Sequence, residues 1–195
     1  MCQFLSVVVL RNGDLRHHPL LDSHSDLITY FALPDTSVYH QHFAKAELTP
    51  PREGTWTDPS TWTWRIDEET RPGWLDDVEG QAEAAARRLV ERMVIRDERA
   101  ILADGVWIVA EGARVRRFLG GRLARIEGGT VEAIEGGTVQ AIEGGTVQAI
   151  WGGTVQAIEG GTVPSRADIN PRWVELGARA KAYYATKDKA TERAK

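Results

Sequence analysis

Residues Gly128–Val163 read GGTVEAIEGGTVQAIEGGTVQAIWGGTVQAIEGGTV, one eight-residue unit repeated four and a half times. So short a unit cannot bury a core alone, so neighbouring copies must stack and share one. A helix is excluded for two reasons. The two glycines of each unit would each destabilise a helix by about 1 kcal/mol, and the apolar residues of the unit do not follow a helical stripe. The unit instead predicts a short Thr-Val-Gln strand followed by a glycine bend. We therefore expect a β-solenoid (β-helix).

The repeat extends further back than the obvious copies. With GGTVQAIE numbered one to eight, position four stays apolar back to Trp107 and position seven back to Ala110. We therefore expect the array to begin near Asp104, with positions four and seven inward and positions three, five and six outward or near a corner. The number of octads per coil stays open. So does the number of chains, since octapeptide repeats also resemble those of phage spike proteins that wind three chains into one β-helix.

The residues before the array predict a small α/β domain. Asn12-Gly13 follows a β-forming run and indicates a hairpin. The last helix carries Leu89, Val90, Met93 and Val94 as its apolar stripe, and we expect it to cover the open end of the solenoid. In order, the expected elements are strands over 3–10 and 15–20, a helix ending near 31, strands over 38–48 and 61–66, and a helix over 78–96.

The residues after the array predict a helix. Asn170-Pro171 is a cap followed by proline at the first helical position, and Trp173, Leu176 and Ala180 share one helical face. The fold class we expect is thus an α+β N-terminal domain (1–103), an all-β solenoid (104–163), and a C-terminal capping α-helix with a basic tail (164–195).

Composition narrows the setting. The 195-residue chain has a net charge of −4, which gives only a weak case for nucleic-acid binding. Its single cysteine, Cys2, excludes an intramolecular disulfide and favours a reducing compartment. No apolar run reaches the roughly 18 residues of a membrane span. The segment Phe4–Leu10 lacks the charged start and the length of a signal peptide. We expect a cytoplasmic protein without membrane association.

The opening MCQFLSVVV, the segment DSHSDLI, the later tryptophan-rich stretch and the tandem octads together resemble a group of uncharacterised phage and bacterial proteins. In that group a globular front domain precedes a variable number of short repeats. The resemblance implies a fold, and a host-cell cytosolic location if the chain is phage-encoded. It implies no activity and no catalytic residues.

Two features of the array are candidate binding sites. Stacking would gather five arginines into a basic patch able to bind phosphate, nucleic acid or an acidic partner, unless glutamates such as Glu111 or Glu127 pair with them. At position eight, Trp151 interrupts a row of glutamates and is a candidate contact aromatic, unless it packs on the C-terminal helix. The five arginines are Arg114, Arg116, Arg117, Arg122 and Arg125.

The front domain holds weaker candidates. Cys2 would be a nucleophile only if Met1 were removed, and a small buried residue is its simpler role. His40 and His42 share a strand face, and His24 with Asp26 lies on a capped turn, so these could hold zinc or a similar ion. Solvated or hydrogen-bonded histidines explain them equally, and we expect no cofactor and assign no catalytic or metal-binding residue.

These observations favour a non-enzymatic interaction or assembly protein of phage or mobile-element type. Its solenoid would be a rigid surface for a protein partner or a homo-oligomer, a dimer or a trimer, and could block a host factor. One alternative is a metal- or cysteine-dependent enzyme in the front domain. Another is a trimeric, spike-like virion component.

Overall fold

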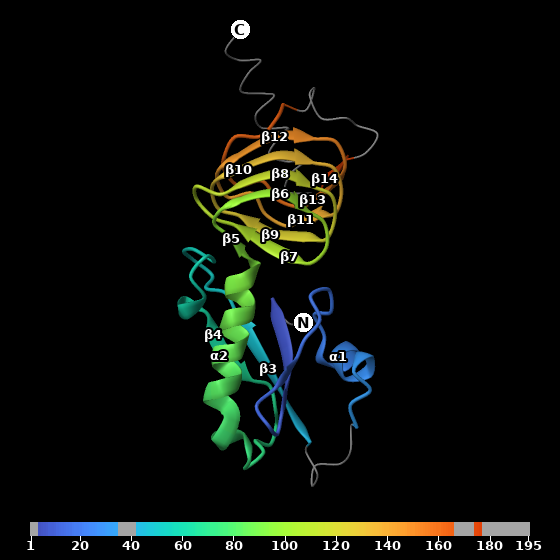
Figure 1. Cartoon of the computed structure of the whole chain (residues 1–195), viewed down its shortest axis with the longest axis vertical. Helices are drawn as coiled ribbons and strands as arrows, with labels where there is room; N and C mark the ends of the chain where they lie inside the picture. The colour runs from blue at the N-terminus through green and yellow to red at the C-terminus, as the bar shows by residue number, and fades with distance from the viewer. Residues whose placement is uncertain (1–3, 35–41, 166–173, 177–195) are drawn as a thin grey trace. The chain divides into compact units, whose positions relative to one another are not determined.

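A computed structural model describes residues 4–34, 42–165 and 174–176 (Figure 1). The chain divides into two compact units, Met1–Arg92 and Met93–Lys195. Each unit is described by itself below. Cys2, His40 and most of the predicted C-terminal helix lie outside the described residues.

The front unit is built on an antiparallel sheet in the order β2-β1-β3-β4. The Asn-Gly hairpin is confirmed: Gly13 has φ +80°, and the turn returns the chain to pair Val9 with Leu15. The returning strand is much shorter than predicted, because only two residues pair. The four strands are β1 (Leu5–Leu10), β2 (Leu15–Arg16), β3 (Phe43–Thr49) and β4 (Thr63–Ile66).

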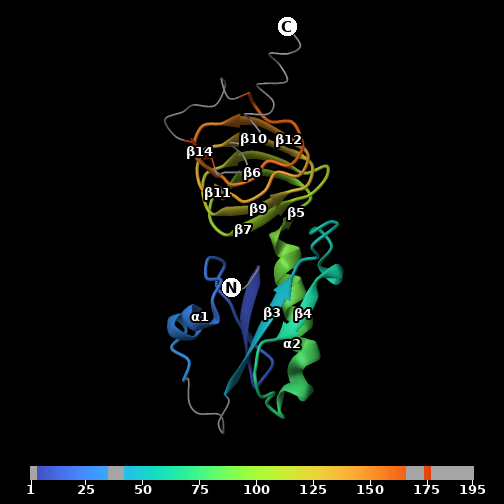
Figure 2. The ribbon, with the colours of Figure 1, turned by 180° about the vertical axis from the view of Figure 1, so that it is seen from behind.

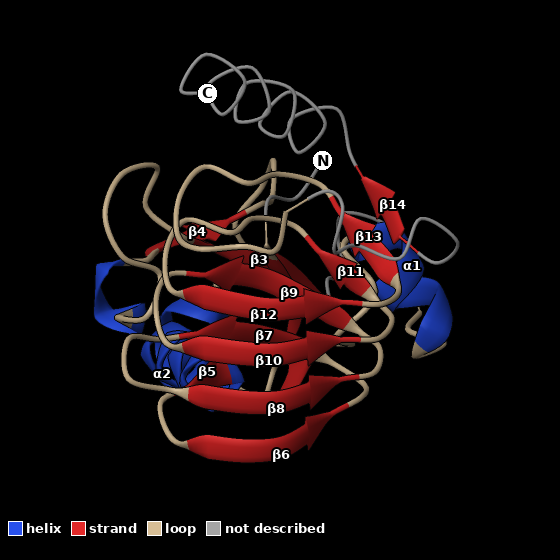
Figure 3. Ribbon diagram, turned by 90° about the horizontal axis from the view of Figure 1, so that it is seen from above, coloured by secondary structure: helices blue, strands red, loops and turns tan. Residues whose placement is uncertain are grey.

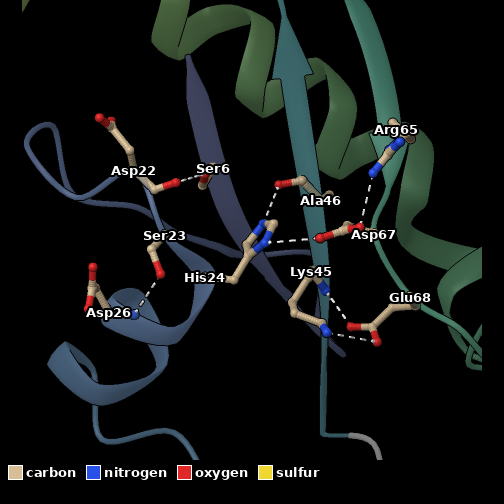
Figure 4. A network of polar contacts seen from close by, with 10 residues as sticks. All are labelled: Ser6, Asp22, Ser23, His24, Asp26, Lys45, Ala46, Arg65, Asp67 and Glu68. Atoms are coloured by element: carbon tan, nitrogen blue, oxygen red, sulfur yellow. Dashed lines mark hydrogen bonds and ion pairs between the residues drawn. The ribbon is translucent and has the colours of Figure 1, made fainter. Parts of the chain in front are cut away.

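Helices lie on both sides of this sheet (Figures 2 and 4). Helix α1 (His24–Tyr30) begins at the N-cap Ser23 and buries Leu27 against Val8 and Phe43. Helix α2 (Leu75–Met93) buries an apolar stripe, and a short 3-10 turn, η1 (Pro59–Thr61), precedes β4. The stripe differs from the prediction, because Leu89 is only half-buried and Val94 belongs to the next strand. Its buried members are Leu75, Ala82, Ala86, Val90 and Met93.

The second unit is a β-solenoid made of two parallel sheets (Figure 3). Val131 pairs with Val147, sixteen residues further along, so each coil contains two octads, one strand per sheet. The first sheet has the order β12-β10-β8-β6, and the second has the order β14-β13-β11-β9-β7-β5.

From β5 to β13 the strands alternate between the two sheets along the chain, and β14 follows β13 in the same sheet. Those of the four-stranded sheet are β6 (Glu98–Leu102), β8 (Arg114–Phe118), β10 (Thr130–Ile134) and β12 (Thr146–Ile150). Those of the six-stranded sheet are β5 (Val94–Ile95), β7 (Val106–Val109), β9 (Arg122–Ile126), β11 (Thr138–Val139), β13 (Gly153–Val155) and β14 (Val174–Leu176).

The inward positions of the octad are confirmed from Val115 to Val163, because positions four and seven are buried in every copy. The alanines of position six, expected outward or near a corner, are buried at Ala133 and Ala157. Stacked valines and isoleucines thus form one continuous core, to which each coil contributes about four apolar side chains.

The start of the solenoid differs from the expectation. Strands β5 and β6 already pair with the coil above, so the stack begins at Val94, directly after α2 ends at Met93. In the first predicted octad, a bulge between Trp107 and Ile108 puts Val109, rather than Ala110, opposite Ile126. A bulge changes which residues pair with the neighbouring strand from that point on, and counting residues in steps of eight cannot reveal it.

The end of the solenoid also differs. The described residues Val174–Leu176 were expected inside the C-terminal helix, but they form strand β14, which pairs in parallel with β13. A strand there continues the open edge of the six-stranded sheet.

Two features of the structure require glycine at the second position of the octad: a positive φ and the lack of space for a Cβ. Gly137 has φ +72°, which disfavours any side chain with a Cβ. A Cβ there would also lie 2.7 Å from the carbonyl oxygen of Gly121 in the coil below. The glycine pair therefore lets the backbones of successive coils approach each other at the bends.

No helix in the described part of the chain is both long enough and apolar enough to cross a membrane.

Candidate functional site

A polar pocket of about 910 Å³ lies in the front unit, between α1 and the face of the sheet formed by β3 and β4. Successive strand residues point to opposite faces, and Glu47 pairs with Arg65 across the two strands. The face opposite is the buried one, with Ala44, Ala46 and Leu48. The polar residues that face the pocket from the strands are Lys45, Glu47, Thr49, Thr63, Arg65 and Asp67.

His24 projects from the first turn of α1 toward this face (Figure 4). Its side chain is held from both ring nitrogens: Nε2 lies 3.0 Å from the carbonyl oxygen of Ala46, and Nδ1 lies 3.4 Å from Oδ2 of Asp67. The residue is only 7% exposed. Because a carbonyl oxygen can only accept, Nε2 carries a proton and donates it to Ala46.

Three side chains converge at this point. One possible ligand atom from each of His24, Glu47 and Asp67 lies within 4.8 Å of the other two. Among the described residues, this group has the composition and spacing that could hold a metal ion.

Basic groups surround the three. Arg65 donates to Asp67 over 3.1 Å. Lys45 forms an ion pair with Glu68 at 3.6 Å, and Glu68 also accepts the backbone N–H of Lys45 over 2.7 Å. These contacts fix the orientation of β3 and of the residues just after β4, and hence of the two carboxylates.

Of these three residues, only His24 was among the candidates predicted from the sequence. Its predicted companion Asp26 lies outside the three-residue group, and His42 is exposed. Glu47 and Asp67 were missed. The alternation of polar and apolar residues along β3 and β4 could have revealed both, because Glu47 and Asp67 are polar residues on the face opposite the buried alanines.

His17 is a second titratable side chain of the front unit with a distinct environment. It is half-buried, and its pKa is lowered, first by burial and then by the positive charges of Arg92 and His18. Its native environment therefore favours the neutral imidazole.

The five predicted arginines lie in one coil but on two sheets. Arg114, Arg116 and Arg117 belong to β8, whereas Arg122 and Arg125 belong to β9. The three on β8 pair with glutamates of neighbouring coils. Arg114 contacts Glu132 at 2.5 Å, Arg116 contacts Glu98 at 2.6 Å, and Arg117 makes two hydrogen bonds to Glu135, at 2.7 and 2.8 Å.

The pair of Arg117 and Glu135 shifts both pKa values in the direction that favours the charged forms. Their hydrogen bond raises the pKa of Arg117 and lowers that of Glu135. On β9, the 14% exposed side chain of Arg125 lies 3.3 Å from Glu127 and 3.4 Å from Glu143. A shared cation thus offsets the repulsion of stacked glutamates. The basic patch itself stays a prediction.

Trp151 is 54% exposed and follows β12 directly. Leu119, 36% exposed, follows β8 in the same way, two coils earlier. The backbone N–H groups of Leu119, Glu135 and Trp151 each donate to the preceding coil in the same pattern, so the three residues stack in one column. Trp173, the expected neighbour of Trp151, lies outside the described residues.

Comparisons with protein-family models, curated proteins and solved structures found no match to this chain. The resemblance to phage and bacterial repeat proteins stays a prediction.

Proposed function

We propose that the solenoid is a non-enzymatic protein-interaction surface through which copies of this chain associate. The observation that carries the proposal is a set of exposed apolar residues at or just after the C-terminal ends of three strands of the four-stranded sheet, β6, β8 and β12. We define the apolar edge as Ile101, Leu119 and Trp151, of which Ile101 is 51% exposed.

The apolar edge combines features of known contact hot spots. Tryptophan is enriched at the centres of interfaces, where it buries a large area at a small entropy cost. The ion pair of Arg117 and Glu135 lies within the same edge, because Glu135 stacks between Leu119 and Trp151, and Arg117 pairs with Ile101 across β6 and β8. Apolar side chains around a fixed ion pair favour a partner that is apolar and carries complementary charges, which a second copy provides under two-fold symmetry.

The rigidity of the solenoid supports this role. Every described coil is fixed by its core and by parallel hydrogen bonds, so the apolar edge is preorganised and loses little conformational entropy on binding. Strand β6, which carries Ile101, is an edge strand of its sheet and offers backbone groups to the same contact.

The test is the native mass of the full chain by size-exclusion chromatography with light scattering. We expect a dimer or trimer for the wild type and a monomer for Trp151→Glu. Glutamate fits the fold here, because Glu135 and Glu159 occupy the same octad position. The control is Gln156→Glu, which adds an equal charge beyond β13, on the other sheet.

A wild-type monomer over a wide concentration range would refute self-association. An unchanged oligomer in Trp151→Glu would refute the apolar edge as the contact. An unchanged mass of three chains in that variant would instead favour the spike-like trimer.

A further inference from the structure

We propose that His24, Glu47 and Asp67 of the front unit form a binding site for a divalent transition metal ion, of which Zn²⁺ is the best-matched example. This site is independent of the solenoid surface, because all three residues and their supporting contacts lie within Met1–Arg92.

The first argument comes from the protons of His24. Since Nε2 donates its proton to Ala46, a neutral ring has a lone pair on Nδ1, and that lone pair faces the Asp67 carboxylate at 3.4 Å. Two electron-rich groups at this separation repel each other unless a cation lies between them. The cation is either a second proton on the ring or a metal ion.

The position of Glu47 distinguishes these two cases. A proton on Nδ1 needs one acceptor, and Asp67 already supplies it. The carboxylate of Glu47 also has an oxygen within 4.8 Å of a ring nitrogen of His24 and of an oxygen of Asp67, and it gives a metal ion a third ligand that an ion pair between His24 and Asp67 does not use. One imidazole nitrogen and two carboxylates are a known three-ligand set for Zn²⁺, with a fourth position left for water.

The second argument comes from the groups behind the three residues. Histidines that bind metals almost always donate their other ring N–H to a carbonyl or carboxylate, which orients the ring. His24 makes such a bond to Ala46, and Asp67 accepts from Arg65. The ring of His24, 7% exposed, therefore approaches the proposed site from the first turn of α1. The carboxylates of Glu47 and Asp67 approach it from the side of the sheet.

The third argument is access. The three residues line a pocket of about 910 Å³ whose other lining residues are mostly polar, so an ion can enter and keep water in its coordination shell. The ligand atoms are up to 4.8 Å apart, whereas two ligands of one zinc ion are about 3–4 Å apart. The ion would draw them together by roughly 1 Å, which rotation of the Glu47 and Asp67 side chains can supply.

The experiment is isothermal titration calorimetry of the full chain with Zn²⁺, after treatment with a chelator. We expect one ion per chain in the wild type and binding at least ten-fold weaker in Glu47→Gln and Asp67→Asn. Both variants keep the size of the side chain and remove its charge. The matched control is Asp26→Asn, which alters a carboxylate lining the same pocket but outside the three-residue group.

A second measurement on the wild type keeps the proposal testable if the variants fold poorly. Nitrogen-15 NMR of the His24 ring should show Zn²⁺ shifting the Nδ1 resonance while Nε2 stays protonated. The absence of saturable binding, equal binding in all variants, or an Nδ1 that stays protonated at saturating Zn²⁺ would each overturn the proposal. The last outcome would assign the contact to an ion pair between His24 and Asp67.

Discussion

The two units use opposite strategies to hold charged groups in place. In the solenoid, an arginine and a glutamate from neighbouring coils meet at a fixed spacing, as Arg114 meets Glu132 and Arg117 meets Glu135. In the front unit, one buried histidine faces two carboxylates, one from β3 and one from the residue directly after β4. Repetition pairs each of these solenoid arginines with a glutamate of a neighbouring coil, whereas the front-unit cluster brings one histidine and two carboxylates together at a single point. The comparison teaches that ligand chemistry is to be sought where the repeat is absent or interrupted.

The largest expected effect tests how strictly the repeat depends on its bends. Gly137→Ala should destabilise the solenoid by about 2–5 kcal/mol, because it combines an unfavourable φ with a clash against the backbone of the coil below. Thermal unfolding followed by circular dichroism measures the loss. Gly112→Ala is the control: it has a similar φ of +78° but open space around the new Cβ, and should cost only about 1 kcal/mol. Equal losses would show that the close approach of coils is unimportant.

A glycine of the front unit should behave in the opposite way. Gly80 lies on the exposed side of α2, where nothing is within 4 Å of an added Cβ. Gly80→Ala should stabilise this unit by about 0.5–1 kcal/mol through helix propensity. Hydrogen exchange of the α2 amides measures it, and faster exchange in the variant would contradict the prediction.

The next effect concerns His17 and pH. Because its folded pKa is lowered from 6.5, the neutral ring stabilises the native state at higher pH. This contribution is complete above about pH 6.5 and is lost as pH falls from there through the lowered folded pKa. We expect the melting temperature of the front unit to fall more steeply between pH 7.5 and 5 in the wild type than in His17→Gln. The exposed His42→Gln serves as control and should keep the wild-type slope.

The smallest expected effect concerns a single ion pair, Arg117 with Glu135, in the ladder of arginine–glutamate pairs that joins neighbouring coils. Glu135→Gln should lower the melting temperature of the solenoid only slightly, because an exposed pair contributes little. The difference from wild type should vanish at 1 M salt, where charges are screened within about 3 Å. Glu111→Gln, an exposed change outside the ladder, should show no such salt dependence. A large loss that persists at high salt would mean that Glu135 acts through packing.

The repeat made most of the solenoid predictable. A period of eight with valine and isoleucine at fixed positions defines inward faces without knowledge of any contact, and Val115 through Val163 follow it. The start escaped prediction because position four of the first coil is Arg99, which is exposed on the edge strand β6 and needs no apolar side chain. The bulge at Trp107 escaped because it changes pairing and not composition.

The metal-site candidate was only partly predictable, for a different reason. His24, Glu47 and Asp67 are each about twenty residues apart, with no local spacing that marks them as a group. They meet because β3 and β4 pair in antiparallel register and α1 packs on the face they share. The sequence pattern grouped His24 and Asp26 with the strand histidines His40 and His42, whereas the alternation of strand faces would have pointed to the carboxylates of Glu47 and Asp67.

The sixteen-residue coil makes the parity of the octad count a determinant of surface geometry. One octad is half a coil, so the gain or loss of a single copy between Leu119 and Trp151 would transfer every later strand to the opposite sheet. The inward valines and isoleucines would fit equally well there, and folding would tolerate the change. Trp151, however, would move to the other side of the stack, away from Leu119. A change by an even number of octads would alter the length of the solenoid and keep Leu119 and Trp151 on the same side of it, whereas a change by an odd number would place them on opposite sides.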